Sequence, residues 1–162
     1  MRTLLLFFLL LFPAITTAQQ LSRQKLAAEV KAEFLHAWTG YKKYAMGHDD
    51  LKPLSKTHHD WYPQPLLMSP VDALDTMILM SMDEEAAAIR DYIAVNLSFD
   101  KDLSVQNFEI TIRLLGGLLS TYQLTQDERF LNLAHDLGKR LLPVFNSPTG
   151  MPYRTSILRP AL

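Results

Sequence analysis

Apolar residues recur at every third or fourth position in five separate segments of the chain, and this spacing places them along one side of a helix. The predicted helices cover residues 22–44, 70–81, 83–96, 104–122 and 125–142. We find no convincing alternation of apolar and polar residues of the kind that marks a half-buried strand. The spacing therefore predicts an all-α fold of helix pairs. Such pairs stack into solenoids or close into toroids.

Short polar signals mark the predicted helix starts. Ser69 is a suitable N-cap for the second helix, and Pro70 fits its first helical position. Asp83 is the expected cap of the third helix. The run Thr-Gln-Asp-Glu at 125–128 has the capping-box pattern and predicts the start of the fifth helix. Pro143 is expected to end that helix, because proline cannot continue it.

The first eighteen residues have the pattern of a secretory signal peptide. Arg2 is followed by an unbroken apolar run over residues 4–12, and Thr16, Thr17 and Ala18 are small residues suited to cleavage. The run is shorter than the roughly 20 apolar residues of a membrane-spanning helix. We therefore predict cleavage after Ala18 and a protein of the secretory pathway, whether secreted, periplasmic or lumenal. A membrane partner is expected only if this segment stays uncleaved.

Composition excludes some classes of function. The formal net charge is −1 and there is no basic run, which weighs against a nucleic-acid partner. The chain has no cysteine, so packing alone must hold it together in an oxidising compartment. The triplet Asn96-Leu97-Ser98 matches the N-glycosylation pattern. Such triplets also arise by chance, and the sequence leaves both interpretations open.

The fourth predicted helix carries two charged residues among apolar ones. Glu109 and Arg113 are four residues apart, so they share a face of the helix. An isolated buried charge is costly, and the pair is therefore either a structural ion pair or part of a functional site. Gly116 and Gly117 follow, each costing about 1 kcal/mol relative to alanine inside a helix. Two adjacent glycines indicate that another helix backbone approaches closely.

Apolar residues occupy almost the whole circumference of this fourth helix, which predicts deep burial. One stripe contains Phe108, Ile112, Leu115 and Leu119, and it is broadened by Leu114, Leu118 and Tyr122.

A long connection over residues 48–70 is rich in proline, histidine and aromatic residues. A connection of this length inside a compact domain is either functional or mobile, and its composition favours a packed or ligand-facing role. Asp49 and Asp50 are expected to structure this loop. His58 and His59 have no third partner at metal-ligand spacing in the sequence, so they are weak candidates for metal ligands.

Four motifs occur in order along the chain. They are YAMGHDDL at 44–51 followed by PLS at 53–55, DALDT at 72–76, FEITIRLLGGLL at 108–119, and RLLP at 140–143 with the turn that runs to Tyr153. Together they resemble the class I α-1,2-mannosidases, glycoside hydrolase family 47. The resemblance covers nearly all of residues 22–162. It implies an (α/α)7 barrel, of which these residues would form the N-terminal portion of the catalytic domain.

The resemblance also implies an activity. Members of this family remove terminal α-1,2-linked mannose from N-glycans with inversion of configuration, so the expected partners are high-mannose oligosaccharides or glycoproteins. They use a Ca²⁺ ion, whose ligand residue we expect beyond the end of this chain, so no metal site is predicted within it. The catalytic base is expected beyond the end as well. The chain by itself is therefore expected to be inactive.

Three residues of the chain receive roles from the resemblance. Glu109 is the candidate general acid, and Arg113 is expected to orient the surrounding carboxylates. Asp75 is a candidate for contact with the sugar, with capping or ion pairing as alternatives. The helix N-terminus and Arg113 both favour ionised Glu109, whereas a general acid must hold its proton. An acid role therefore requires further carboxylates nearby, or burial.

Two other classes of function stay open on the sequence. One is a non-catalytic glycan-binding module related to glycoprotein quality-control factors. The other is a helical-repeat scaffold without sugar chemistry. For the binding module, the discriminating observation is the sequence expected beyond the end of this chain, because intact acidic residues and the Ca²⁺-site threonine would imply an enzyme. Replacement of Glu109 by glutamine in a complete protein separates the scaffold from the enzyme, because a scaffold would be unaffected whereas an enzyme would lose its rate.

Overall fold

The structure, a computed structural model, describes residues 22–159. The chain divides into two compact units, Met1–His36 and Ala37–Leu162. The described part of the first unit is the beginning of helix α2 (Arg23–Tyr44), and the other elements belong to the second unit. The signal peptide predicted over residues 1–18 lies outside the described residues. None of the described helices is long and apolar enough to cross a membrane.

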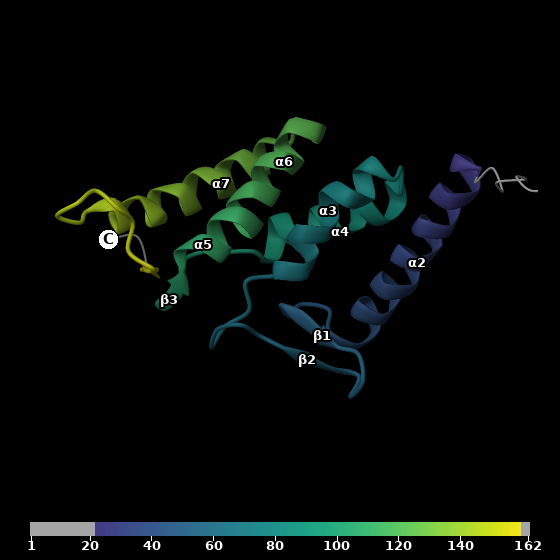
Figure 1. Cartoon of the computed structure of the whole chain (residues 1–162), viewed down its shortest axis with the longest axis horizontal. Coiled ribbons are helices and arrows are strands. Elements are labelled where there is room, and N and C mark those ends of the chain that lie inside the picture. Colours follow the sequence, from purple (N-terminus) through teal and green to yellow (C-terminus); the bar gives the residue numbers. More distant parts are fainter. Residues whose placement is uncertain (1–21, 160–162) are drawn as a thin grey trace, which may run out of the picture. The chain divides into compact units, whose positions relative to one another are not determined.

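Two helix pairs form the centre of the second unit. The first pair is α3 (Met68–Leu79) with α4 (Asp83–Asn96), and the second is α6 (Gly116–Thr125) with α7 (Glu128–Leu141). Each helix packs against its partner, and α3 also packs against α6, which joins the two pairs (Figure 1). The prediction of a mainly helical fold built from helix pairs is thereby confirmed.

The last turns of α2 contribute to the second unit. The helix agrees with the one predicted over residues 22–44, and Trp38 and Tyr41 are buried with their rings stacked at 5.1 Å between centroids. Trp38 Nε1 donates a hydrogen bond of 3.0 Å to the Glu85 carboxylate, and Lys42 Nζ donates to the same carboxylate at 2.6 Å. These contacts fix the C-terminal end of α2 to α4.

The described residues also contain two short strand pairs, although the sequence shows no convincing alternation. Strand β1 (Asp50–Lys52) pairs antiparallel with β2 (Thr57–His59) inside the long connection. Strand β3 (Leu103–Gln106) pairs antiparallel with β4 (Thr155–Leu158). Strands of three or four residues are too short for alternation to stand out from the surrounding sequence.

The predicted fourth helix consists of three consecutive parts. Helix α5 (Asn107–Ile110) leads into a π-helical turn, η1 (Thr111–Leu115), and then into α6. The predicted start at residues 104–107 is wrong for its first three residues, because β3 extends to Gln106. The spacing of apolar residues carries no signal for a π turn.

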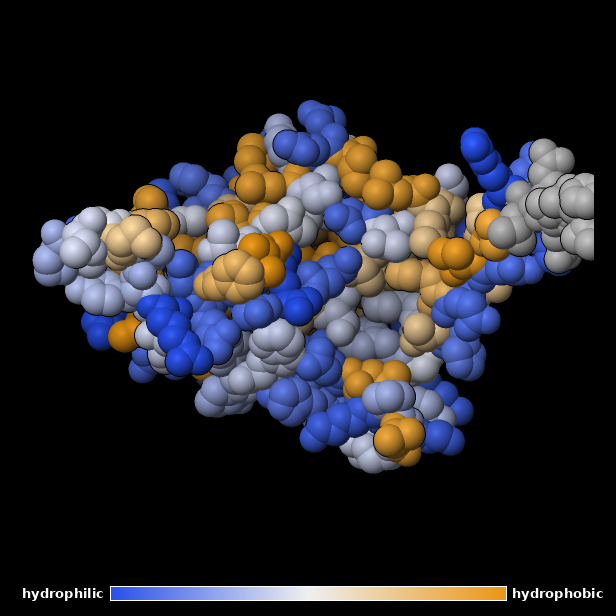
Figure 2. All heavy atoms as spheres, viewed as in Figure 1, coloured by the Kyte–Doolittle hydropathy of each residue, from blue (hydrophilic) through white to orange (hydrophobic). Residues whose placement is uncertain are grey.

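The deep burial predicted for the whole of this segment is found on one side only. Phe108 is 66% exposed and Ile112 is 52% exposed, whereas Ile110, Leu114 and Leu118 are fully buried. The turn η1 packs against α3 and α7 and therefore buries one side only. Hydrophobic side chains also reach the surface in the region of α6, as Figure 2 shows. Where apolar residues surround a helix, their spacing does not say which side packs.

Helix α3 begins at Met68, and its cap comes from a distant part of the chain. Leu67 occupies the N-cap position with φ of 56° and ψ of 42°. The carboxylate of Asp49 is fully buried, and its Oδ1 accepts a hydrogen bond of 3.2 Å from the Met68 N–H. Ser69 Oγ instead donates to the Asp49 carbonyl at 2.6 Å. The prediction of a Ser69 cap is therefore wrong, and the loop-structuring role of Asp49 is confirmed.

The starts of the other two helices lie within three residues of their predicted positions. Asp83 is the first residue of α4, and Met82 occupies the N-cap position. Helix α7 begins at Glu128, and the N-cap Asp127 accepts a hydrogen bond of 3.1 Å from the Arg129 N–H. The predicted capping box is thus displaced, because its first residue is the last residue of α6.

Helix α7 ends at Leu141, directly before a short 3₁₀ turn, η2 (Leu142–Phe145), that contains Pro143. This confirms the predicted end of the fifth helix. The largest fully buried side chains of the second unit come from both helix pairs, from α5 and η1, from β4, and from the segments that precede α3 and β3. They are Leu66, Met68, Leu74, Met77, Ile93, Phe99, Ile110, Leu114, Leu118, Phe130, Leu137 and Leu158.

Candidate active site

Arg113 bridges two carboxylates that come from different helices. Its Nε donates a hydrogen bond of 2.8 Å to Glu109 Oε2, and its Nη1 donates one of 2.7 Å to Asp72 Oδ2. All three side chains are half-buried. We call Asp72, Glu109 and Arg113 the carboxylate–arginine cluster. The sequence predicts the Glu109–Arg113 pair, but it does not identify Asp72 as the third member.

The close approach of α3 and α6 explains why Asp72 meets Arg113. A Cβ atom on Gly117 would lie 2.8 Å from Val71 Cγ1 and 3.2 Å from the Val71 carbonyl oxygen. Val71 directly precedes Asp72, and Gly117 lies about one turn after Arg113. A Cβ on Gly116 would meet a backbone oxygen of the preceding turn at 3.6 Å, an ordinary contact. The predicted helix approach is therefore confirmed at Gly117 and does not involve Gly116.

The cluster contains more negative than positive charge. Burial raises the pKa of the Asp72 carboxyl, the hydrogen bond and charge of Arg113 oppose this rise, and the charges of Asp75 and Asp50 add to it. The hydrogen bonds to Glu109 and Asp72 raise the pKa of the Arg113 guanidinium. One guanidinium shared by two carboxylates leaves a net negative charge, which favours a proton within the cluster.

Trp61 forms a further side of the cluster. The Arg113 guanidinium carbon lies 5.1 Å from the centroid of the Trp61 ring, within the range of a cation–π contact. Trp61 Nε1 donates a hydrogen bond to the Asp50 carboxylate, and its backbone N–H donates one of 3.1 Å to Asp49 Oδ2. The two aspartates therefore position Trp61. The sequence gives no signal for this contact, which depends on the path of the connection after β2.

Asp75 lies in the interior of α3 and faces α6. Its Oδ2 accepts a hydrogen bond of 2.9 Å from Ser120 Oγ, and its Oδ1 accepts one of 3.4 Å from Thr76 Oγ1. Its position, about two turns after the start of α3, rules out a capping role. The half-buried carboxylate is oriented by these hydroxyl groups.

Metal-ligating residues come together at one place among residues 22–159. His48, His58 and Asp60 offer ligand atoms that all lie within 4.8 Å of one another. Calcium takes oxygen ligands, and this group offers two imidazole nitrogens and one carboxylate. The described residues therefore do not fit the calcium site that the family resemblance implies.

A pair of carboxylates around an arginine, carried on packed helix pairs, is compatible with a glycoside hydrolase. The model of glycosyl hydrolase family 47 matches residues 33–161. The chain therefore belongs to this family.

Two curated relatives show how much of a complete protein is covered. The chain is 50% identical over 131 residues to the endoplasmic reticulum mannosyl-oligosaccharide 1,2-alpha-mannosidase of Mus musculus. This aligned region covers 81% of this chain and 19% of the relative. It is 38% identical over 141 residues to the enzyme of the same name from Schizosaccharomyces pombe, and that aligned region covers 86% of this chain and 27% of the relative. The chain thus spans about a fifth to a quarter of the length of these relatives.

A solved structure gives the same picture for the fold. The alpha-1,2-mannosidase from Trichoderma reesei superposes with a TM-score of 0.73 and 31% sequence identity, over 83% of this chain and 32% of that chain. The arrangement of helix pairs is therefore part of an α-1,2-mannosidase fold, which is the (α/α)7 barrel predicted from the motifs.

Proposed function

We propose that this chain forms the acid-bearing part of an inverting α-1,2-mannosidase that removes terminal mannose from high-mannose oligosaccharides. Membership of glycosyl hydrolase family 47 and the names of the curated relatives support the reaction class. The observation that carries the proposal is the position of Glu109, held by Arg113 opposite Asp72. Inverting glycosidases need one carboxyl group that gives a proton to the leaving oxygen and another that activates water.

Glu109 is the proposed general acid. Arg113 pairs with the carboxylates of both Glu109 and Asp72. The guanidinium fixes the orientation of the Glu109 carboxyl through the Nε hydrogen bond, and Asp72 fixes the guanidinium. Arg113 and Asp72 are therefore positioning residues.

Asp75 is proposed as a contact to a sugar hydroxyl, with Ser120 holding the carboxylate in place. We assign no residue of this chain as the catalytic base. The family resemblance suggests Ca²⁺ as the cofactor, and no step is assigned to it because the described residues do not provide its ligands. The relatives named after the endoplasmic reticulum support a lumenal place in the secretory pathway and a glycoprotein substrate.

A chimera provides the test. Residues 33–161 of this chain replace the matching segment of the Mus musculus relative, and the product is incubated with α-1,2-mannobiose. The chimera is expected to release mannose, first as the β-anomer because the configuration inverts. Glu109→Gln in the chimera is expected to lower kcat/KM by about 10²–10⁴-fold, the usual contribution of a general acid. Glu84→Gln, at an exposed position of α4, is the matched control.

The outcomes separate the candidate functions. A folded chimera that binds high-mannose oligosaccharide without hydrolysing it would contradict the enzyme function and favour a glycan-binding module. A folded chimera that neither binds nor hydrolyses would favour the helical scaffold. Equal rates for Glu109→Gln and Glu84→Gln would remove Glu109 from the acid role.

A further inference from the structure

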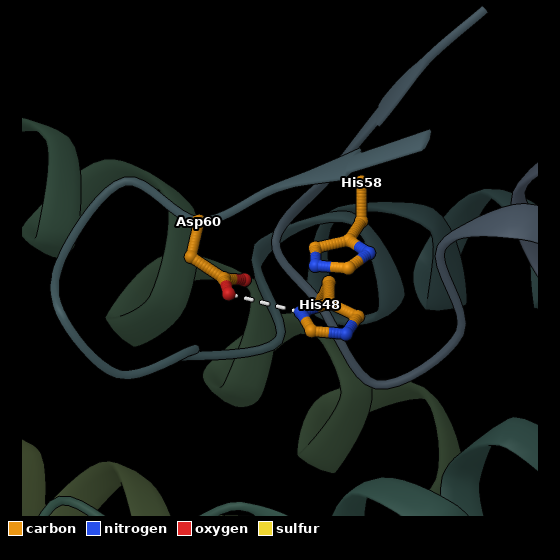
Figure 3. Close-up of side chains that lie close together, drawn as sticks. All are labelled: His48, His58 and Asp60. Carbon is orange, nitrogen blue, oxygen red and sulfur yellow. Dashed lines mark hydrogen bonds and ion pairs between the residues drawn. The ribbon is translucent and has the colours of Figure 1, made fainter. Parts of the chain in front are cut away.

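The connection between α2 and α3 brings together two imidazoles and one carboxylate that the proposed reaction does not use. His48 precedes β1, His58 lies in β2, and Asp60 follows β2 directly. His48 Nδ1 lies 2.9 Å from Asp60 Oδ2, and the rings of His48 and His58 are stacked at 3.4 Å between centroids (Figure 3). The ligand atoms of all three side chains lie within 4.8 Å of one another. The fold thus supplies His58 with the partners that its sequence neighbours do not offer.

We propose that His48, His58 and Asp60 bind a divalent transition-metal ion of the zinc class. Imidazole nitrogen suits Zn²⁺, Ni²⁺, Cu²⁺ and Fe²⁺, whereas Ca²⁺ and Mg²⁺ take oxygen ligands. Two histidines and one carboxylate give three protein ligands, which leaves coordination positions open to water. One carboxylate with two neutral imidazoles leaves a bound divalent ion with a single net positive charge, so the site does not require further acidic residues.

The carboxylate ligand is already oriented. Asp60 Oδ1 accepts a hydrogen bond of 3.0 Å from the Asp49 N–H, which turns Oδ2 towards His48 (Figure 3). Hydrogen bonds of this kind orient the ligands of known metal sites.

The backbone around the ligands is also fixed. The buried carboxylate of Asp49 accepts hydrogen bonds from the N–H groups of Trp61 and Leu66, at 3.1 and 2.7 Å. The ladder between β1 and β2 holds His58 opposite Leu51. Binding therefore needs movement of side chains and not of the loop. The exposed side of His58 gives an ion direct access from solvent.

The present ring geometry defines the movement that binding requires. The planes of His48 and His58 are within 10° of parallel, and the lone pair of an imidazole nitrogen lies in the plane of its ring. Stacked rings cannot both point a lone pair at one ion. His58 must turn away from the stack while His48 and Asp60 stay in place. His58 lies on an exposed strand, where a rotamer change meets little resistance.

The neighbouring His59 provides a matched control. Successive residues of a strand point to opposite faces, and the His59 Nδ1 lies 3.4 Å from Asp50 Oδ2 instead. His58→Ala and His59→Ala therefore remove the same chemical group from the same strand, but only the first removes a proposed ligand.

The test is a Zn²⁺ titration of the full 162-residue chain by calorimetry, with Co²⁺ absorption as a report on coordination. The unmodified chain is expected to bind one equivalent, with imidazole-type Co²⁺ bands. His58→Ala and Asp60→Asn are each expected to weaken Zn²⁺ binding by at least about tenfold, since even the loss of a group that only orients a ligand costs about 10–100-fold. His59→Ala is expected to bind as the unmodified chain does. Far-UV circular dichroism checks that each variant is folded.

Two results would overturn the site. The first is absence of Zn²⁺ binding by the folded, unmodified chain. The second is an affinity that His58→Ala and His59→Ala change equally, or that neither changes, because the ion would then lie elsewhere. Retained hydrolysis by the chimera leaves this proposal untouched, since none of the three ligands belongs to the carboxylate–arginine cluster.

Discussion

Gly117→Ala tests the packing that brings Asp72 to Arg113. The added Cβ would lie 2.8 Å from Val71 Cγ1 and 3.2 Å from the Val71 carbonyl oxygen, well inside the usual contact distance of about 3.5–4.0 Å. Val71 is buried and β-branched, so its side chain has little freedom to rotate in a helix. Overpacking of this kind costs about 1–3 kcal/mol, against a gain in helix propensity of about 1 kcal/mol. We expect a net loss of up to about 2 kcal/mol.

Gly116→Ala is the matched control one residue away. Its Cβ would meet a backbone oxygen at 3.6 Å, an ordinary contact, so the helix propensity gain of about 1 kcal/mol should appear as added stability. Urea unfolding of the 162-residue chain, followed by circular dichroism, measures both variants. The two are expected to differ by about 1–3 kcal/mol, or several degrees in Tm at about 2–4 °C per kcal/mol.

The reasoning fails if the two alanine variants are equally stable, or if Gly117→Ala is the more stable one. A double-mutant cycle identifies the clashing atom. Val71→Ala removes Cγ1 but leaves the carbonyl oxygen in place, so the cost of Gly117→Ala should fall by at least about 0.5 kcal/mol in that background without vanishing. Absence of coupling would show that the two helices do not meet at these residues.

Three further outcomes follow from the described contacts. Leu114→Ala, at a fully buried position, should lower the free energy of unfolding by about 2–5 kcal/mol. Ile112→Ala, at a half-exposed position, should change this free energy by no more than about 0.5 kcal/mol. Urea unfolding compares the two variants, and similar costs would refute the assigned orientation of η1. The hydrogen bond from Lys42 lowers the pKa of Glu85, so this group stabilises the fold above the ordinary value of 4.5 and the contribution is lost as pH falls through the lowered value. Unfolding followed as the pH falls from neutral into the acid range should therefore show a shallower decline for Glu85→Gln, and an unchanged decline would contradict the coupling. Arg113→Lys in the chimera should lower kcat/KM, because an ammonium group lacks the planar fork that binds two carboxylates at once, and full activity would refute the bridging role.

The sequence predicts those features that depend on neighbours in the chain. The Glu109–Arg113 pair is confirmed, because side chains four residues apart on a helix lie next to each other. The close approach at Gly117 is also confirmed, because glycine destabilises a helix interior and its presence there indicates that a side chain would not fit. The helix pairs predicted from the spacing of apolar residues are likewise confirmed.

Features that depend on distant parts of the chain are missed. Asp72 lies 41 residues from Arg113, and Asp49 caps a helix that begins 19 residues later. Short-range capping signals indicate Ser69, which is a good cap by type but has a better partner in the Asp49 carbonyl. Leu114, not Ile112, faces the core, because only the packed neighbours decide between two apolar sides of one helix.

The charge on Asp72 has opposite consequences for stability and for the proposed reaction. Burial raises the pKa of this carboxyl above its ordinary value of 3.8, so the folded chain binds this proton more readily than the unfolded chain does. The free energy of unfolding therefore falls as pH rises from the ordinary pKa through the raised one, and the loss persists at neutral pH. Asp72→Asn removes this loss and keeps an oxygen that can accept from Arg113.

We therefore expect Asp72→Asn to leave the stability of the chain at neutral pH unchanged or higher, while kcat/KM of the chimera falls. The rate falls because a neutral amide at position 72 holds the Arg113 guanidinium less firmly than a carboxylate does, and Arg113 in turn orients Glu109. Urea unfolding at neutral pH and the pH dependence of kcat/KM measure the two effects on matched proteins. A variant that loses stability but keeps its kcat/KM would make Asp72 a structural residue, because Arg113 would then orient Glu109 without it.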